Sequence, residues 1–307
     1  MGTVVVLGSL NYDCIALVDA FPKPGNTVAA RDLMFQLGGK GGNQAVAAAK
    51  QDAHVIMIGC VGDDSAGVAY IDYLGRRNIA TAGIIIREGV PTGTALICVN
   101  PQAENTIVVG LGANATITPA EVEAQSQLIA RGTILLTQFE VPVEAAATAL
   151  RLARPLGTTT CLNPSPWREG FPWGEVEIDF VIVNEHEAAQ LLSKPVRSLG
   201  DLGWIREALT AKAINTLIVT RGSDSTLAFS SRGPSLEIPI LEVEAVDTVG
   251  AGDCFTGAFA ARWADSRQLE PALRAASVAG ALATLKPGAQ EATPSTAEVD
   301  AALLRLE

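Results

Sequence analysis

One acidic residue, Asp253, stands directly after a glycine-rich turn in the segment VDTVGAGDCFTGAF. The turn consists of Gly250, Ala251 and Gly252. Large apolar residues then recur every four positions, which predicts a buried helix beginning near Gly250: Phe255, Phe259 and Trp263. The first N–H groups of a helix have no intrahelical partner and can bind an anion such as phosphate. Asp253 is therefore either a helix cap or a catalytic base beside a phosphate site, and the glycines, which capping does not require, favour a ligand.

A second glycine-rich stretch, FQLGGKGGNQAVAAAK, places Lys40 among four glycines and predicts a helix that starts near Asn43. It is not a P-loop, because Lys40 is followed by glycine rather than by Ser or Thr. The glycines either form a strand-to-helix turn with positive φ or let the backbone approach a ligand, and spacing alone leaves both readings open. The candidate ligand-binding residues here are Gly39, Lys40, Gly41, Gly42 and Asn43.

Polar and acidic side chains follow several predicted strands, at the edge where open parallel sheets bind ligands. Asn11 and Asp13 follow the first strand, where an Asx-type turn is the alternative reading. Glu140 ends another strand, where a lone acid is usually solvated. Asn184 and Glu187 lie three residues apart at a strand-to-helix junction. They either interact with the helix dipole or contact Mg²⁺ and phosphate through water.

Composition excludes several classes of protein. The net charge of −11 disfavours nucleic acid as a partner. No apolar run is long enough to span a membrane, and the N-terminal MGTVVVLGSL predicts a strand rather than a signal peptide. Five scattered cysteines without a C-x-x-C pair indicate free thiols, so a cytoplasmic protein is expected. His54 and His186 have no Cys or His neighbours, so zinc is not expected.

Short apolar runs alternate with alanine-rich helical segments, which predicts an α/β fold with a mainly parallel sheet covered on both faces. The predicted strands are residues 3–8, 54–62, 133–140, 158–164, 179–185 and 215–222. The predicted helices include residues 43–51, 65–77, 118–130, 141–153 and 199–211. Residues 11–37 and 91–110 lack a long helix, so we expect a small antiparallel flap inserted into a single domain, residues 1–307.

The motifs, taken in order, resemble the ribokinase branch of the ribokinase/PfkB family of sugar and nucleoside kinases. The resemblance runs nearly from end to end and rests on LGSLNYD, GGKGGNQAVAA, GCVGDDSAG, GANATITPA, LNPSP, NEHEAAQLL, AVDTVGAGDCFTGA and KPGAQ. It implies a ribokinase-like three-layer α/β/α sandwich with a small β-sheet lid. It also implies ATP-dependent phosphorylation of the primary (5-) hydroxyl of D-ribose, and a homodimer that pairs through the lid.

The resemblance also implies a role for each candidate residue. Asp253 would be the general base, and the charge of the γ-phosphoryl group would be held by the N–H groups of Gly250, Ala251 and Gly252. The sugar would contact Asp253 and a set of polar residues and loop positions: Asn11, Asp13, Gly39, Lys40, Gly41, Gly42, Asn43 and Glu140.

For the nucleotide and the cations, the resemblance implies further sites. Asn184 and Glu187 would serve Mg²⁺ and phosphate. The nucleotide would lie along Gly252, Ser277 and the loop Thr220, Arg221, Gly222, Ser223, Asp224 and Ser225. A potassium ion would bind the Asp247 carboxylate and the backbone carbonyls of Val249, Ala283, Lys286 and Gly288.

Three residues depart from the family's pattern. Ser225 replaces a common glycine in the nucleotide loop, Ala292 replaces a polar residue near the cation, and Tyr12 is large enough to narrow the sugar pocket. The first alternative function is a related kinase for deoxyribose, fructose or a nucleoside. A non-catalytic sugar or nucleotide sensor is the second. A nicotinamide dehydrogenase is more distant, because no dinucleotide fingerprint follows the first strand.

Overall fold

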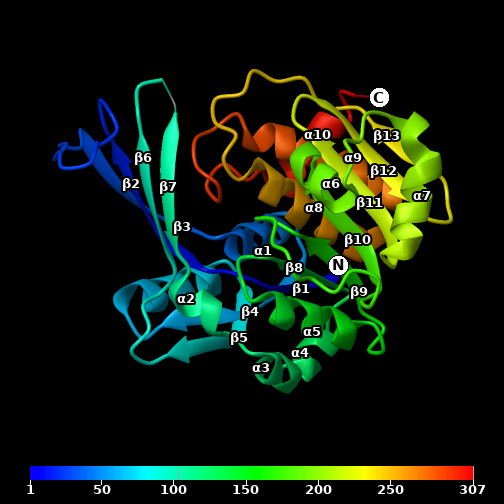
Figure 1. Cartoon of the computed structure of the whole chain (residues 1–307), viewed down its shortest axis with the longest axis horizontal. Helices are drawn as coiled ribbons and strands as arrows, with labels where there is room; N and C mark the ends of the chain where they lie inside the picture. The colour runs from blue at the N-terminus through cyan, green and yellow to red at the C-terminus, as the bar shows by residue number, and fades with distance from the viewer. Residues whose placement is uncertain (103, 307) are drawn as a thin grey trace.

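The computed structural model describes residues 1–102 and 104–306, and its centre is a nine-stranded sheet (Figure 1). Its strands are β1 (Thr3–Leu7), β4 (His54–Gly62), β5 (Ile79–Arg87), β8 (Ile134–Gln138), β9 (Thr159–Asn163), β10 (Ile178–Asn184), β11 (Ile214–Arg221), β12 (Asp224–Ser230) and β13 (Leu236–Ile238). The order across the sheet is β13, β12, β11, β10, β9, β8, β1, β4, β5. All pairs from β11 to β5 are parallel, whereas β12 and β13 are antiparallel. The strands predicted from the apolar runs are all present.

Alternate residues of a strand point to opposite faces, and each face of this sheet carries a hydrophobic core. Val4 and Val6 of β1 pack into one core, and Val5 and Leu7 into the other. The first core is covered by α1 (Lys40–Lys50), α2 (Ser65–Arg76), α8 (Ala251–Ser266), α9 (Leu269–Ala283) and α10 (Thr296–Leu303). The second is covered by α3 (Pro119–Ala124), α4 (Ser126–Ala130), α5 (Val143–Ala153), α6 (Glu185–Leu192) and α7 (Leu202–Ala211). The predicted three-layer α/β architecture is confirmed.

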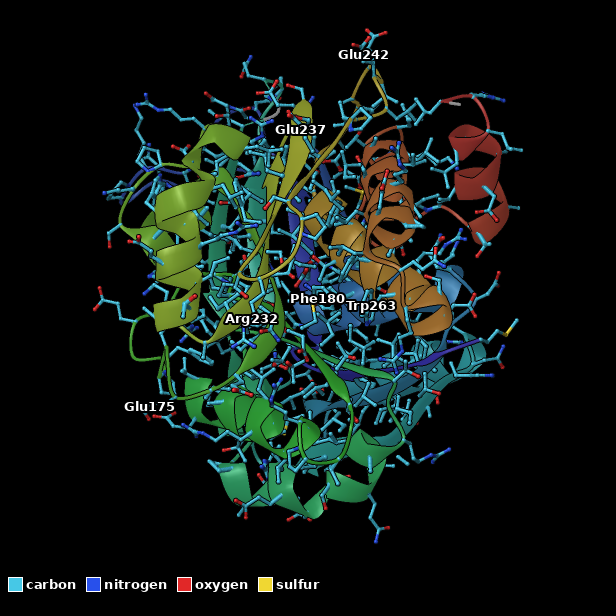
Figure 2. All side chains as sticks on the ribbon, turned by 90° about the vertical axis from the view of Figure 1, so that its right-hand side faces the viewer. Glu175, Phe180, Arg232, Glu237, Glu242 and Trp263 are labelled. Carbon is cyan, nitrogen blue, oxygen red and sulfur yellow. The ribbon has the colours of Figure 1, made fainter. Side chains whose placement is uncertain are left out.

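An aromatic cluster joins the sheet to α8. The ring centroid of Phe180, on β10, lies 4.7 Å from that of Trp263 and 5.0 Å from that of Phe259, both edge to face. Figure 2 shows Phe180 and Trp263 next to one another where the sheet meets the helix. These contacts anchor α8, the helix that carries Asp253. Its bounds, Ala251–Ser266, confirm the predicted helix and its start beside Gly250.

A separate four-stranded sheet projects away from the main body (Figure 1). It contains β2 (Asn11–Leu17), β3 (Asp32–Gly38), β6 (Thr94–Val99) and β7 (Asn105–Gly110), in the order β3, β2, β6, β7. The β2–β6 pair is parallel, so this sheet is not purely antiparallel as predicted. A smaller sheet built from these two segments is confirmed, whereas its action as a lid inserted into a single domain stays a prediction.

The remaining features are the short 3-10 turns, the cysteines and the character of the helices. Short 3-10 turns lie at η1 (Gly112–Thr116) and η2 (Leu199–Asp201). The cysteines are free thiols, as predicted: Cys14, Cys60, Cys98, Cys161 and Cys254. Over residues 1–102 and 104–306, no helix has both the length and the apolar character needed to cross a membrane.

Candidate active site

Asp253 lies in the first turn of α8, which begins directly after Gly250, a residue with a left-handed backbone (φ 76°). Asp253 is only 7% exposed. Asp253 Oδ1 accepts a hydrogen bond from Gln44 Nε2 at 2.9 Å, and Oδ2 accepts one from Asn43 Nδ2 at 2.9 Å. The carboxylate thus bonds to α1 rather than to the N–H groups of its own helix. Of the two sequence-based readings, the helix cap is therefore wrong.

The glycine-rich turn before Asp253 presents part of its backbone to a ligand. Gly250 and Gly252 line a cavity together with Asp253. The Ala251 N–H donates to the Thr248 carbonyl at 3.3 Å, so this group is less open than the sequence predicts. The other first-turn N–H groups lie at the positive end of the helix dipole, which suits a phosphate oxygen.

The cavity beside Asp253 has a volume of about 130 Å³. It lies where the carboxyl ends of β9, β10 and β11 meet the N-termini of α1, α6 and α8. This is the edge of the sheet at which open α/β folds bind ligands. Its polar lining includes Lys40, Asn163, Asn184, Glu187, Thr220 and Thr256. The structure thereby brings together residues that the sequence assigned to the sugar, the magnesium ion and the nucleotide.

Lys40 is the cationic residue that lines this cavity. Burial lowers its pKa, but the carboxylates of Asp253, Glu140 and Glu187 outweigh burial, and the pKa lies above its usual value. The ammonium group is therefore charged at neutral pH. A fixed positive charge beside a helix N-terminus suits a phosphate better than a neutral sugar hydroxyl. The resemblance groups Lys40 with the residues that contact the sugar, whereas its charge and its place in the cavity favour contact with a phosphate.

Close packing explains the glycines that surround Lys40. The helix α1 begins at Lys40, three residues earlier than predicted, because Gly39 is its N-cap with φ 81°. A Cβ on Gly41 would lie 2.5 Å from the backbone that follows β1, and a Cβ on Gly42 would lie 1.9 Å from Tyr70 Oη. The turn reading therefore accounts for Gly39. Contacts within the protein account for Gly41 and Gly42.

Glu140, which follows β8, stabilises the start of α1. Its Oε2 accepts hydrogen bonds from the Lys40 backbone N–H at 2.9 Å and from the Ser9 hydroxyl. A carboxylate at this end of a helix satisfies an unpaired N–H group and interacts favourably with the dipole. Glu140 Oε1 accepts no hydrogen bond from the residues that the structure describes, so it remains for a ligand.

Asn11 and Asp13 begin β2, and each is oriented by one neighbour. Asn11 Oδ1 accepts a hydrogen bond from Asn114 Nδ2 at 2.8 Å, and Asp13 Oδ1 accepts one from the Ala95 N–H at 3.1 Å. Burial raises the pKa of Asp13 to about 6, although the Ala95 N–H opposes the shift. Asn114 is fully buried and was not singled out from the sequence.

Tyr12 stands between these two residues on the same strand. Successive side chains of a strand face opposite sides, so Tyr12 points away from Asn11 and Asp13. Its ring stacks on Phe35 with centroids 5.8 Å apart. Tyr12 therefore does not narrow a pocket formed by Asn11 and Asp13, contrary to the sequence-based expectation.

Asn184 and Glu187 form a capping box at the start of α6. The Glu187 N–H donates to Asn184 Oδ1 at 2.8 Å, and the Asn184 N–H donates to Glu187 Oε2 at 3.0 Å. The reading as a helix-end pair is thus correct, and both residues also line the cavity. Asn184 Nδ2 and Glu187 Oε1 bond to none of the described residues, so these two atoms remain for a ligand.

Residues 220–225 form the hairpin that joins β11 to β12. Arg221 Nε donates to the Ser225 carbonyl at 2.7 Å, and the Ser225 hydroxyl donates to Glu237 Oε1 at 2.5 Å. Figure 2 labels Glu237 on β13. Ser225 therefore ties the hairpin to β13. Ser277 on α9 donates to the backbone carbonyl that follows β13, at 3.3 Å.

Asp247 brings two of the predicted cation-binding residues together. Its Oδ1 accepts the Val249 N–H and its Oδ2 accepts the Gly288 N–H, both at 3.0 Å. The other two predicted residues precede Gly288 in the chain: Ala283 is the last residue of α9, and Lys286 is exposed. One carboxylate with backbone carbonyls is a donor set of hard oxygen atoms that fits potassium. Nowhere in the described chain do three or more His, Cys, Asp or Glu residues gather as a metal site.

Four buried amides that surround Asp253 were not predicted from the sequence. Gln44 Oε1 accepts a hydrogen bond from Gln138 Nε2 at 2.6 Å, and Gln44 Nε2 donates to Asn163 Oδ1 at 3.1 Å. The fourth amide, Gln290, contacts the α1 side of the site. Three of them lie within quoted motifs (Gln44, Asn163 and Gln290), and Gln138 is the last residue of β8. That position is a signal, but it does not say which side chains meet.

Comparison with known proteins agrees with this geometry. A model of the pfkB family carbohydrate kinases matches residues 1–296. The chain is 34% identical to the ribokinase of Schizosaccharomyces pombe, covering 98% of this chain and 97% of that protein, and 33% identical to the deoxyribokinase of Salmonella typhimurium, covering 95% of each. A solved structure of the Arabidopsis thaliana ribokinase complexed with ribose and ATP matches with a TM-score of 0.89 at 26% identity, covering 98% of each chain. The chain therefore belongs to the pfkB family of carbohydrate kinases.

Proposed function

We propose that this chain transfers the γ-phosphoryl group of ATP to the primary (5-) hydroxyl of D-ribose, giving ribose 5-phosphate and ADP. One observation carries the proposal: the Asp253 carboxylate is held by Asn43 and Gln44 at the N-terminus of α8, beside a cavity. The likeness to the S. pombe and A. thaliana ribokinases over nearly the whole chain supports ribose as the sugar.

Asp253 is the general base of the proposed reaction. It accepts the proton of the 5-hydroxyl as that oxygen attacks the γ-phosphorus. The bond between the γ-phosphorus and the β–γ bridging oxygen then breaks, and ADP leaves. The two amide donors on the carboxylate keep it aimed away from its own helix. Phosphoryl transfer asks the protein mainly for such positioning and for charge stabilisation.

Two groups stabilise the charge on the transferred phosphoryl group. The N–H groups of Gly250 and Gly252 meet it from the start of α8, and the Lys40 ammonium group meets it from α1. The raised pKa of Lys40 and its place in the cavity lining support this role. Thr220 lines the same cavity at the start of the hairpin 220–225, which supports the hairpin as the nucleotide side of the site.

The sugar hydroxyls are bound on the other side of Asp253. Asn11 and Asp13 come from the small sheet, whereas Asn43 and Glu140 come from α1 and the end of β8. A sugar between these groups contacts both parts of the molecule. We propose that the small sheet acts as a lid, since closure over the sugar excludes water and limits hydrolysis of ATP.

Two cations complete the proposal. Asn184 and Glu187 would serve the Mg²⁺ ion that accompanies ATP, since Mg²⁺ retains several waters and needs few protein carboxylates. When bound it neutralises phosphate charge. A K⁺ ion would be held where Asp247 draws Val249 and Gly288 together. Ala292 is buried and offers no side-chain oxygen there, so backbone carbonyls supply the remaining ligands.

Release of ADP, measured with ribose, deoxyribose, fructose and nucleosides, tests the substrate. Ribose is expected to give the highest kcat/KM, and K⁺ is expected to raise the rate. The likeness to the S. typhimurium deoxyribokinase makes deoxyribose the second candidate. Strong turnover of another substrate without turnover of ribose would contradict the proposal. Binding of ATP without transfer to any acceptor would favour a sensor instead.

The small sheet also supports a homodimer. Directly paired residues share a face, and one face of this sheet carries exposed apolar side chains: Leu33, Phe35, Leu96 and Val108. We propose that two copies cover this face, because such a patch is otherwise an aggregation hazard. Light scattering should report a dimer, and Phe35→Lys should give a monomer. A cytoplasmic location stays a prediction.

A further inference from the structure

The orientation of the Asn43 amide follows from counting hydrogen-bond donors. An ionised carboxylate can only accept, so Asn43 must turn its Nδ2 towards Asp253 Oδ2, 2.9 Å away. Asn43 Oδ1 then faces the opposite way and needs a donor of its own. Gln290 Nε2 lies 3.0 Å from that oxygen. Gln290 therefore supplies the donor that holds Asn43 in this orientation.

The second amide hydrogen of Gln290 is also used. Gln290 Nε2 lies 2.9 Å from Tyr70 Oη, and the Tyr70 hydroxyl donates to the Gly38 carbonyl at 2.6 Å. Burial raises the pKa of Tyr70 well above its usual value, so the hydroxyl keeps its proton and its direction. Gly38 is the last residue of β3 in the small sheet. One buried amide thus links Asn43 to the end of that sheet.

The two residues before Gln290 contact Asp247 and Gly250, which precede Asp253 in the chain. The Gly288 N–H donates to Asp247 Oδ2 at 3.0 Å. Ala289 packs against Gly250 so closely that a Cβ on Gly250 would lie 2.6 Å from Ala289 Cβ. Residues 288–290 therefore contact both the turn that precedes Asp253 and the amide that orients it.

Gln290 is 1% exposed, and its Oε1 accepts no hydrogen bond within residues 1–102 and 104–306. Burying an amide with one unpaired oxygen is unfavourable, and an apolar side chain of the same size would avoid it. Unlike an apolar side chain, however, the amide donates hydrogen bonds to Asn43 and Tyr70. This pattern indicates a role in the site rather than in stability.

We propose that Gln290 is a positioning residue for phosphoryl transfer: it holds Asn43 in the orientation that donates to Asp253. Without this donor, the Asn43 amide keeps only its hydrogen bond to Asp253, so it is held at one end and can move away from the position that fixes the carboxylate. The inference rests on the proposed function, in which Asp253 accepts the sugar proton.

The test compares two buried glutamines that join α1 to the segment 285–295. Gln51 is 6% exposed; it donates to the Pro294 carbonyl at 3.1 Å and accepts from Arg262, but it does not touch the site. Gln290→Met should lower kcat roughly 10- to 100-fold, as misplacement of a reacting group does. Gln51→Met, which removes hydrogen bonds outside the site, should leave kcat near wild type whatever its effect on the melting temperature. Equal kcat values in the two variants would overturn the inference.

A double-mutant cycle separates positioning from general damage. In an Asn43→Ala background, Gln290→Met should lower kcat little further, whereas Gln51→Met should have the same effect as in wild type. Independent, multiplying losses for Gln290→Met and Asn43→Ala would also overturn the inference. If Gln290→Met folds poorly, Gln290→Leu, which also lacks a donor and carries no charge, takes its place, and the same loss of kcat is expected.

Asp253→Asn keeps the two proposals distinguishable. If that variant retains full turnover, the proposed base is wrong whatever the Gln290 variants do. If it is inactive while Gln290→Met behaves like Gln51→Met, only the role of Gln290 fails.

Discussion

Gln44 Nε2 lies 2.9 Å from Asp253 Oδ1, so the buried amide of one helix holds the carboxylate of another. The two helices approach closely at this point, because Gly257 of α8 has no side chain: a Cβ there would lie 2.4 Å from the Gln44 carbonyl oxygen. Asn43 binds the second carboxylate oxygen. The direction of Asp253 is therefore a property of the contact between α1 and α8.

Replacing the proposed base should remove most turnover. Asp253→Asn lowers the ability to accept the sugar proton and also turns an amide nitrogen towards the donor on either Gln44 or Asn43. We expect kcat to fall by about 10²- to 10⁴-fold, the range of general-base catalysis. Calorimetry should show nearly unchanged ATP binding. Retained full turnover would contradict the assignment.

The charge of Lys40 should matter for ATP and not for the sugar. Lys40→Met removes the cation from the cavity, so kcat/KM for ATP should fall by about 100-fold, as for loss of one charge-stabilising group. The KM for ribose should change little. Lys50→Met, an exposed lysine at the other end of α1, is the matched control and should behave as wild type. A large change in the KM for ribose with an unchanged KM for ATP would return Lys40 to the sugar side.

Asp13 should make stability depend on pH. Its pKa is raised from 3.8 to about 6 in the folded state, so folding favours the neutral form. This stabilisation is complete below the unfolded value and is lost as the pH rises through about 6. Asp13→Asn cannot ionise, so the free energy of unfolding should exceed that of wild type by about 1–2 kcal/mol at pH 8, after allowance for solvent screening.

Urea titrations of wild type and Asp13→Asn at pH 4 and pH 8 measure this difference. It should be much smaller at pH 4, where both side chains are largely neutral. A difference that does not change with pH would mean that Asp13 acts through packing or hydrogen bonding alone.

The close approach of α1 and α8 can be tested at Gly257. A methyl group there meets backbone, which cannot rotate aside, so Gly257→Ala should cost about 1–3 kcal/mol of stability. It should also lower kcat, because it separates Asp253 from Gln44. Gly75→Ala in α2 is the control, since a Cβ there meets nothing within 4 Å. That variant should be neutral or stabilising, by up to about 1 kcal/mol.

Much of the fold could be predicted because the signals are local. The β-branched runs and the four-residue spacing of Phe255, Phe259 and Trp263 reflect the periodicity of a strand or a helix, and each predicted strand was found, whereas the predicted helix 118–130 is divided into α3 and α4. The start of α1 was misplaced by three residues, because glycines weaken helix propensity. Tight packing against the backbone after β1 and against Tyr70 requires them there.

Sequence by itself determined the elements, their order and the motif residues, because residues close in the chain set these properties. Only the tertiary structure decided which side chains meet. Asp253 and Asn43 are 210 positions apart, and no local pattern encodes their hydrogen bond. The same holds for Lys40, whose charge is set by carboxylates from three other elements, and for Gln290, whose partners lie on α1 and α2. Long-range packing fixes such contacts, and through them the direction in which a carboxylate or an ammonium group points.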